Sequence, residues 1–235
     1  MGGCESAGQG DGRVWLDVPY VDRKRVALLG ASWDFVARRY YIDEQVEPAL
    51  FEAWRPLPPS GVFPTEDRTF GGSSLYVDLI PDSCFFVNVR SCVTRRDWQR
   101  LRRFVGDRVS WSCEICGARP SGSDGDYLDI HERWQYLDCG VQRLRRLIAL
   151  CRGCHGATHF GFAELSGRRD EAMAQLQRVN GWDDAMALAH VDAAFGLWAE
   201  RNEMLWVLDL TMIQEAGIRV VRPGEVAVDS GLLVD

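Results

Sequence analysis

The sequence lacks any uninterrupted apolar run of the roughly 20 residues that a membrane-spanning helix requires. Residues 1–12 are rich in glycine and contain acidic side chains, without the apolar segment typical of a secretory signal. A general excess of positive charge is also missing, because the 235 residues carry a formal net charge of −7. These absences argue against a membrane protein, a secreted protein and a protein that binds nucleic acid over its whole surface.

Positive charge is nevertheless concentrated in the middle of the chain. Residues 90–154 contain 13 arginines and 8 acidic residues, a net charge of +5, which leaves −12 for the remainder. A local basic surface can bind phosphate groups on an otherwise acidic protein. For the arginines of a helix predicted from Thr94 to Val105, a solvated helix face is the alternative. The candidate nucleic-acid contacts in this region are Arg95, Arg96, Arg100, Arg103, Arg143 and Arg145.

Eight cysteines would permit disulfides, but the chain is too long for a small disulfide-stabilised scaffold. Four of them form two C-x2-C pairs, Cys113 with Cys116 and Cys151 with Cys154. Two such pairs can complete the tetrahedral four-thiolate site that holds structural zinc. We therefore expect one structural Zn²⁺ and a reducing, cytoplasmic location. The remaining cysteines are interpreted as buried or incidental thiols: Cys4, Cys84, Cys92 and Cys139.

Three of the four histidines follow or lie between the cysteine pairs. His155 and His159 are four residues apart, so a helix that begins after Cys154 would point both side chains at one spot. His131 ends the strand-like run YLDIH. The pattern predicts a second, open metal site made of histidines. The fourth histidine, His190, lies on a later predicted helix and is interpreted as structural.

The combined pattern is C-x2-C, a strand that ends in a histidine, and then L-C-x2-C-H-x3-H. It resembles the HNH, or ββα-metal, nucleases. The block 62–217 as a whole resembles bacterial proteins of this type that combine an H-E-R-W motif with a helical C-terminal part. The residues that carry the resemblance are Cys113, Cys116, His131, Cys151, Cys154, His155 and His159.

The resemblance implies that His131, His155 and His159 hold one divalent ion (Mg²⁺, Mn²⁺, Ni²⁺ or Zn²⁺) and that Glu132 is the general base. The sequence departs from the family at two positions. Glu132 stands where the family has a histidine, and Arg146 stands where it has an asparagine. Arg146 could replace the asparagine by binding phosphate directly. Glu132 could instead be a fourth ligand, which would close the site and make it structural.

The N-terminal segment carries the motifs L-D-V-P-Y at 16–20 and L-G-A-S-W-D at 29–34, followed by R-R-Y-Y. It resembles a small domain of unknown function seen in bacterial plasmid and DNA-processing proteins. Aromatic side chains beside arginines could stack on unpaired bases, and the alternative is that they form the core of a small domain. The candidate contacts are Trp33, Arg38, Arg39 and Tyr40.

These patterns predict an α+β fold, with a zinc-stabilised ββα-metal (HNH-like) core, C-terminal helices and a small N-terminal α+β domain. The predicted segments are a disordered tail at 1–12, a small nucleic-acid-binding domain at 13–58, an HNH-like domain at 62–217, and a strand with a tail at 218–235. The HNH-like domain is divided into a core at 111–162 and a helical extension at 163–217. The predicted strands include 14–20, 75–80 and 84–90. The predicted helices are 22–29, 44–54, 94–105, 168–179, 183–200 and 206–215.

Two functions are supported by several of these patterns, and a third, a zinc hydrolase of small substrates, is supported by the three histidines alone. The first is a metal-dependent DNA endonuclease or nickase that hydrolyses phosphodiester bonds with one catalytic ion. The second is a catalytically inactive, zinc-stabilised module that binds nucleic acid or a protein. Tightly held zinc without any activity that depends on added Mg²⁺ or Mn²⁺ would favour the second.

Overall fold

The computed structural model describes residues 12–122 and 127–221, and the chain divides into two compact units, Met1–Pro59 and Ser60–Asp235. Helices and strands both contribute, so the fold is α+β, as the sequence predicts. Most of the predicted tail at 1–12 and most of the C-terminal tail lie outside the described residues, as do Cys4 and loop residues 123–126.

The N-terminal unit is a three-stranded antiparallel sheet with one short α-helix. Its elements are β1 (Val14–Leu16), α1 (Arg23–Leu28), β2 (Ser32–Asp34) and β3 (Arg39–Ile42), and the strand order is β1-β3-β2. The indole N–H of Trp54 donates to Asp22 at 2.9 Å, so the polar atom of this buried ring is satisfied. The core consists of Leu16, Val26, Ala31, Ile42, Phe51 and Trp54.

Two predicted elements of the N-terminal unit are shorter than expected. The strand predicted over 14–20 ends at Leu16, and the helix predicted over 44–54 is a 3-10 helix at Pro48–Trp54. Glu47 has an extended backbone, which the ring of a following proline favours, so this helix cannot begin earlier. Helix α1 ends before Gly30, whose φ of +104° suits a residue without a Cβ.

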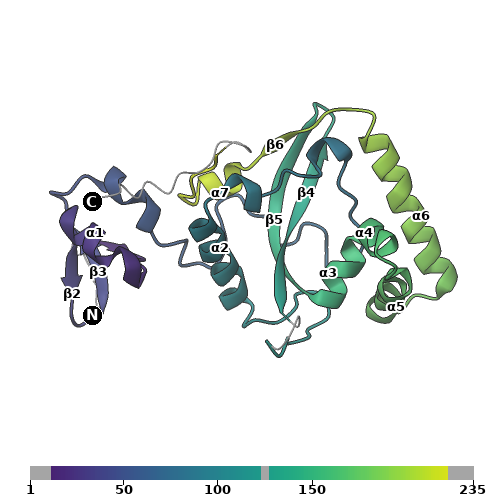
Figure 1. Ribbon diagram of the computed structural model, residues 1–235, viewed down its shortest axis with the longest axis horizontal. Helices are drawn as coiled ribbons and strands as arrows, with labels where there is room; N and C mark the ends of the chain where they lie inside the picture. The colour runs from purple at the N-terminus through teal and green to yellow at the C-terminus, as the bar shows by residue number, and fades with distance from the viewer. Residues whose placement is uncertain (1–11, 123–126, 222–235) are drawn as a thin grey trace, which may run out of the picture. The chain divides into compact units, whose positions relative to one another are not determined.

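The C-terminal unit is built on a long antiparallel hairpin of β4 (Leu128–Leu137) and β5 (Val141–Cys151), and β6 (Val207–Asp209) pairs parallel to the start of β5. The order β4-β5-β6 leaves β4 at an edge. Helix α2 (Arg95–Arg108) packs on one face and α3 (Arg152–Thr158) on the other (Figure 1). Residues 147–150 of β5 are all buried, as expected for a strand that is covered on both faces.

Helix α2 begins where the sequence predicts and ends three residues later. The Thr94 hydroxyl accepts a hydrogen bond from the Asp97 N–H at 3.1 Å and caps the helix. In the last turn, the Arg108 guanidinium donates to both carboxylate oxygens of Glu66 at 2.7 and 3.0 Å, and both side chains are buried. This pair anchors the extra turn beyond Val105.

The predicted strands at 75–80 and 84–90 are wrong. The backbone N–H groups of Leu75 and Val77 donate to the side chains of Asn180 and His190, at 3.0 and 2.9 Å, rather than to a neighbouring strand. Short 3-10 helices replace the second strand, at Asp82–Cys84 and Arg90–Cys92. Because helix side chains satisfy this backbone, the apolar run is buried without joining the sheet. His190 thus has a structural role.

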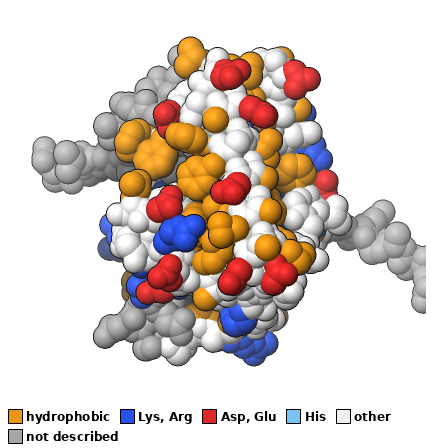
Figure 2. Space-filling model, turned by 90° about the vertical axis from the view of Figure 1, so that its right-hand side faces the viewer, with side chains coloured by type: hydrophobic (Ala, Val, Ile, Leu, Met, Phe, Trp, Pro, Cys, Tyr) orange, Lys and Arg blue, Asp and Glu red, His pale blue; other side chains and the backbone are white. Residues whose placement is uncertain are grey.

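In the described part of the unit, four more helices follow: α4 (Phe160–Leu165), α5 (Arg169–Asn180), α6 (Asp184–Arg201) and α7 (Thr211–Gln214). The helix predicted over 206–215 is divided between β6 and α7. Figure 2 shows the side of the molecule that α5 and α6 form, where hydrophobic and acidic side chains predominate and basic ones are few. Within the described residues, no helix is both long and apolar enough to cross a membrane.

Candidate metal centres and the adjoining cavity

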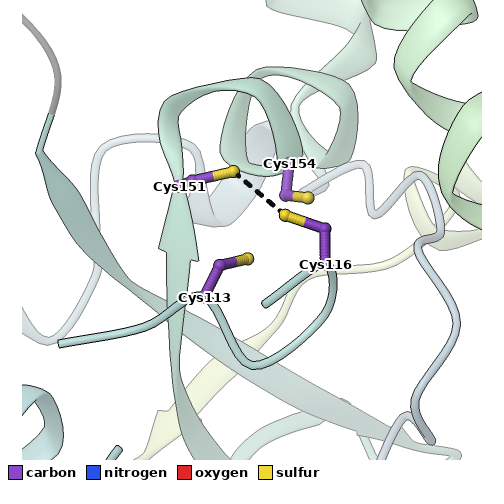
Figure 3. Close-up of side chains that lie close together, drawn as sticks. All are labelled: Cys113, Cys116, Cys151 and Cys154. Carbon is purple, nitrogen blue, oxygen red and sulfur yellow. Dashed lines mark hydrogen bonds between the residues drawn. The ribbon is translucent and has the colours of Figure 1, made fainter. Parts of the chain in front are cut away.

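Four cysteines gather at the junction of a loop, the end of β5 and the start of α3. Cys113 and Cys116 lie in the loop before β4, Cys151 ends β5 and Cys154 lies in α3, and their side chains converge (Figure 3). The four sulfurs lie within 4.8 Å of one another, and those of Cys116 and Cys151 are 3.6 Å apart. Two sulfurs bound to one tetrahedral zinc are about 3.8 Å apart. This cysteine cluster could therefore hold a metal ion.

Glu114 fixes the cysteine loop to the sheet. Its backbone N–H donates to the Ala149 carbonyl, and its carboxylate accepts from the Ala149 N–H, both at 2.9 Å. The other carboxylate oxygen accepts from Arg68 at 2.7 Å and from Arg146 at 2.9 Å. On the far side, the Gln175 amide of α5 donates to the Cys154 sulfur at 3.1 Å. Hydrogen bonds to sulfur and around the ligands hold such sites in position.

Three histidines form a second cluster on the face of the sheet that α3 covers. His131 comes from β4, while His155 and His159 come from α3 and its C-terminal end. One ring nitrogen from each lies within 4.8 Å of the others. The i, i+4 spacing holds because the His159 N–H donates to the His155 carbonyl at 3.0 Å, although the helix bends there into α4. We call these residues the histidine cluster.

His131 is 2% exposed, and neither of its ring nitrogens has a hydrogen-bond partner within the described residues. A buried polar group without a partner costs free energy unless a ligand satisfies it. Burial also lowers the pKa of His131 well below its ordinary value, and it lowers that of His159 to about 4. Both imidazoles are thus neutral at neutral pH, which is the form that binds metal ions. The residues fit a divalent ion.

Asp129 orients His155, and this contact was not predicted from the sequence. Its carboxylate lies 3.1 Å from the Nδ1 atom of His155, so an Nδ1–H donated to Asp129 leaves Nε2 for an ion. Residues two apart on a strand point to the same face, which brings Asp129 to the side of β4 that carries His131. The D-x-H spacing within the run YLDIH is the signal that could have predicted this contact.

A cavity of about 680 Å³ opens beside the histidine cluster, and Glu132 lines it together with all three histidines. Successive residues of a strand point to opposite faces, but β4 is an edge strand, so His131 and Glu132 can reach one cavity around that edge. Burial raises the pKa of Glu132 to about 7, although the Val89 N–H donates to its carboxylate at 3.2 Å. We call this space the histidine cavity.

Arg146 does not contact the histidine cavity, contrary to the prediction that it binds phosphate there. Its guanidinium donates to Glu114 at 2.9 Å and to the carbonyls of Phe70 and Gly72 at 3.4 Å, and it is buried. It lies opposite Arg133 in the hairpin, two residue pairs along the strands from the pair of His131 and Ile148. Its position in the sheet therefore assigns it to the support of the cysteine loop.

Three more of the predicted arginine contacts are held by carboxylates. These pairs are Arg100 with Asp97 at 2.8 Å, Arg143 with Asp209 at 2.7 Å and Arg145 with Asp67 at 3.5 Å. Arg95 lines a groove next to the histidine cavity, Arg96 is half-buried, and Arg103 is exposed but lines neither space. The arginines of the sequence pattern are thus dispersed over several surfaces rather than gathered on one.

In the N-terminal unit, the predicted aromatic and basic contacts surround the β2–β3 hairpin. Trp33 and Tyr40 face each other across it with ring centroids 4.9 Å apart. Neither belongs to the fully buried core, and Trp33 is exposed. Arg38 lies in the turn with a φ of +52°, and Arg39 approaches the Trp15 ring at 5.8 Å. Of these two aromatic residues, only Tyr40 packs against the core, and it is only partly buried.

The structure thus defines a two-unit α+β protein with a cysteine cluster and a histidine cluster in its larger unit. Comparison with known families matches residues 13–56 to a family described as a domain of unknown function (DUF5710). The match coincides with the segment whose motifs resemble a small domain of unknown function. No curated protein and no solved structure matches the chain.

Proposed function

We propose that the C-terminal unit is a metal-dependent DNA endonuclease or nickase of the HNH type. The observation that carries this proposal is the shared cavity, in which three histidines and the carboxyl of Glu132 line one space. The order of these residues along the chain is also the order of the HNH pattern. The resemblance to HNH nucleases suggests the reaction, hydrolysis of a phosphodiester bond. The cavity provides space for a phosphodiester beside the histidines and Glu132.

The cysteine cluster is the structural centre in this proposal, and Zn²⁺ is the ion that suits it. Four thiolates satisfy zinc in a closed tetrahedral site and leave no position for substrate. The thiols of Cys151 and Cys154 hydrogen-bond to Cys113 and lower the pKa of Cys113, so a thiolate is favoured even before an ion binds. The histidine cluster, with three ligands and an adjoining cavity, is the open centre.

Bound at the histidine cluster, a divalent ion such as Mg²⁺, Mn²⁺, Ni²⁺ or Zn²⁺ would stabilise the charge that develops on the phosphate oxygens. Glu132 accepts a proton from the attacking water, whose oxygen forms the new bond to phosphorus. The bond from phosphorus to the 3′ oxygen breaks, and that oxygen takes up a proton, which leaves 5′-phosphate and 3′-hydroxyl ends. A cation nearby favours the ionised carboxylate that this role needs.

A second function, a catalytically inactive zinc-stabilised binding module, is supported by two observations. Arg146, at the position of the family's asparagine, is committed to Glu114. The burial that raises the pKa of Glu132 to about 7 weakens its ionisation at neutral pH when no cation is bound. In either function, we propose that the DUF5710 unit adds affinity for nucleic acid through Trp33 and the arginines of the β2–β3 hairpin.

The test is incubation of the full chain with supercoiled plasmid and with single-stranded DNA in Mg²⁺, Mn²⁺, Ni²⁺ or Zn²⁺. We expect cleavage with at least one ion. Glu132→Gln should keep the ion and lose about 10²–10⁴-fold in rate, because the amide has nearly the same shape but cannot accept a proton. His155→Ala should lose ion and activity together. Glu200→Gln, the same change on the exposed face of α6, is the control and should cleave normally.

Two outcomes would contradict the catalytic assignment. Release of the ion by Glu132→Gln would make Glu132 a ligand and the histidine centre a closed, structural one. Absence of cleavage with every ion would favour the binding module.

A further inference from the structure

A second hollow, of about 600 Å³, adjoins the histidine cavity at the N-terminal half of α2. We call it the arginine groove. The two spaces share Arg90, Trp98, Tyr127 and Asp129 as lining residues, so they lie side by side. Arg95, Gln99 and Arg102 line only the groove. A ligand that lies in the groove can therefore extend to the histidines.

The groove is positively charged. Three arginines line it, and Asp129 is the single carboxylate among the described residues that do so. That carboxylate already faces His155 at 3.1 Å. Within the described part of the chain, Arg90 and Arg95 have no ion-pair or hydrogen-bond partner, and Arg102 donates only to the Leu128 carbonyl at 3.4 Å. Unpaired guanidinium groups in a groove are available to phosphate oxygens.

Aromatic rings lie between these arginines. Trp98 is half-buried and Tyr127 is 50% exposed, and both line the groove and the cavity. Further along, Phe85 and Phe162 line the histidine cavity and remain 59% and 60% exposed. Exposed rings offer faces on which nucleobases can stack. A paired duplex hides the faces of its bases, whereas an unpaired strand presents both phosphates and base faces.

We propose that the arginine groove binds an unpaired strand of nucleic acid and leads it to the histidine cavity. Arg90, Arg95 and Arg102 contact the phosphates, and Trp98 and Tyr127 stack on bases. This assignment names the substrate class of the proposed nuclease and rests on that function only for the cutting step. The α5–α6 face has the opposite character, because acidic and hydrophobic side chains predominate there (Figure 2), so that face does not favour a polyanion.

The test is the affinity of the full, zinc-loaded chain for labelled 20-nucleotide single strands of DNA and RNA and for a duplex of the same sequence. Binding is measured by fluorescence anisotropy without added divalent ions, and a gel checks that the oligonucleotide stays intact. We expect the single strands to bind at least tenfold more tightly than the duplex. Tyr127→Leu should weaken single-strand binding about tenfold, whereas Tyr127→Phe should restore it, because phenylalanine keeps the stacking face.

A pair of variants on one helix tests the charge. Arg95→Ala should lower the slope of log affinity against log salt by about 0.7, the value for one phosphate contact on a single strand. Arg103→Ala removes the same charge from an exposed position of α2 outside the groove and should leave the slope unchanged. An acidic peptide of equal charge should compete poorly, because it has no bases to stack. Circular dichroism verifies that each variant is folded.

The proposal is overturned by equal affinity for duplex and single strand, by full affinity of Tyr127→Leu, by equal slopes for the two arginine variants, or by effective competition from the acidic peptide. The experiments test this proposal separately from the nuclease assignment. Single-strand binding that depends on Tyr127, without cleavage in any metal ion, supports the groove and refutes the nuclease. Cleavage of duplex that is unaffected by Tyr127→Leu supports the nuclease and refutes the groove.

Discussion

The contact between Asp129 and His155 gives a quantitative test of the histidine centre. Asp129→Asn keeps the shape of the side chain but removes the negative charge that accepts the Nδ1–H of His155 at 3.1 Å. Without that acceptor, the ring can rotate or bind through the wrong nitrogen. Loss of such a partner typically reduces metal affinity 10- to 100-fold.

For Asp129→Asn, the structure favours a loss of metal affinity near the lower end of this range. The two side chains are 30% and 31% exposed, so water can replace part of the lost hydrogen bond. We therefore expect about a tenfold weaker ion affinity, or about 1.4 kcal/mol. His131 is buried, and its ring nitrogens have no hydrogen-bond partner among the described residues, so it should still favour binding of the ion.

The assay is calorimetric titration with Mn²⁺ of the chain that carries one equivalent of Zn²⁺, which the four thiolates bind in preference. Thiolates prefer zinc, and imidazole and carboxylate sites accept manganese, so Mn²⁺ reports the histidine cluster while zinc occupies the cysteines. Asp209→Asn is the control, because it makes the same change in a surface pair with Arg143. Unchanged Mn²⁺ affinity in Asp129→Asn, or an equal loss in Asp209→Asn, would refute the orienting role.

Two further predictions concern the rest of the molecule. Cys113→Ser should lose about one zinc per chain and melt at a lower temperature, because structural zinc contributes folding free energy. Cys139→Ser changes an exposed cysteine outside the cluster and should keep the zinc content and the melting temperature. Full zinc content and an unchanged melting curve in Cys113→Ser would exclude the site. A chain of residues 60–235 should remain soluble, since it forms a compact unit, and should bind single strands more weakly with a reduced salt slope. Identical binding at every salt concentration would exclude a nucleic-acid role for the N-terminal unit.

The cysteine cluster and the start of α2 were predictable because their signals are local. A C-x2-C pair brings two sulfurs together through one turn of the chain, and Thr94 caps a helix through the residue three positions later. The run from Leu75 to Ile80 misled because its apolar, β-branched residues suit a strand equally well. Its backbone is satisfied by Asn180 and His190, more than 100 residues away, and no local pattern encodes that contact.

The arginines show the same limit at the candidate site. Sequence position marks Arg146 as the replacement for the family's asparagine, yet its partner is Glu114 in the cysteine loop. Arg90 was not among the predicted contacts, although it lies where the groove meets the cavity. Which arginine faces solvent depends on the carboxylates that folding brings near it. Net charge along the chain predicts the presence of a basic surface but not its members.

The two clusters are joined by one helix, and this makes the histidine centre depend on the cysteine centre. Helix α3 has seven residues, too few to be stable alone in water. Cys151 immediately precedes it and Cys154 lies in its first turn, so an ion at the cysteine cluster would tie that turn to the loop and to the end of β5. His155 follows Cys154 directly, and its direction is therefore set by the same turn. The dependence runs one way, because the cysteine cluster is also held by Glu114 and Gln175, neither of which involves the histidines.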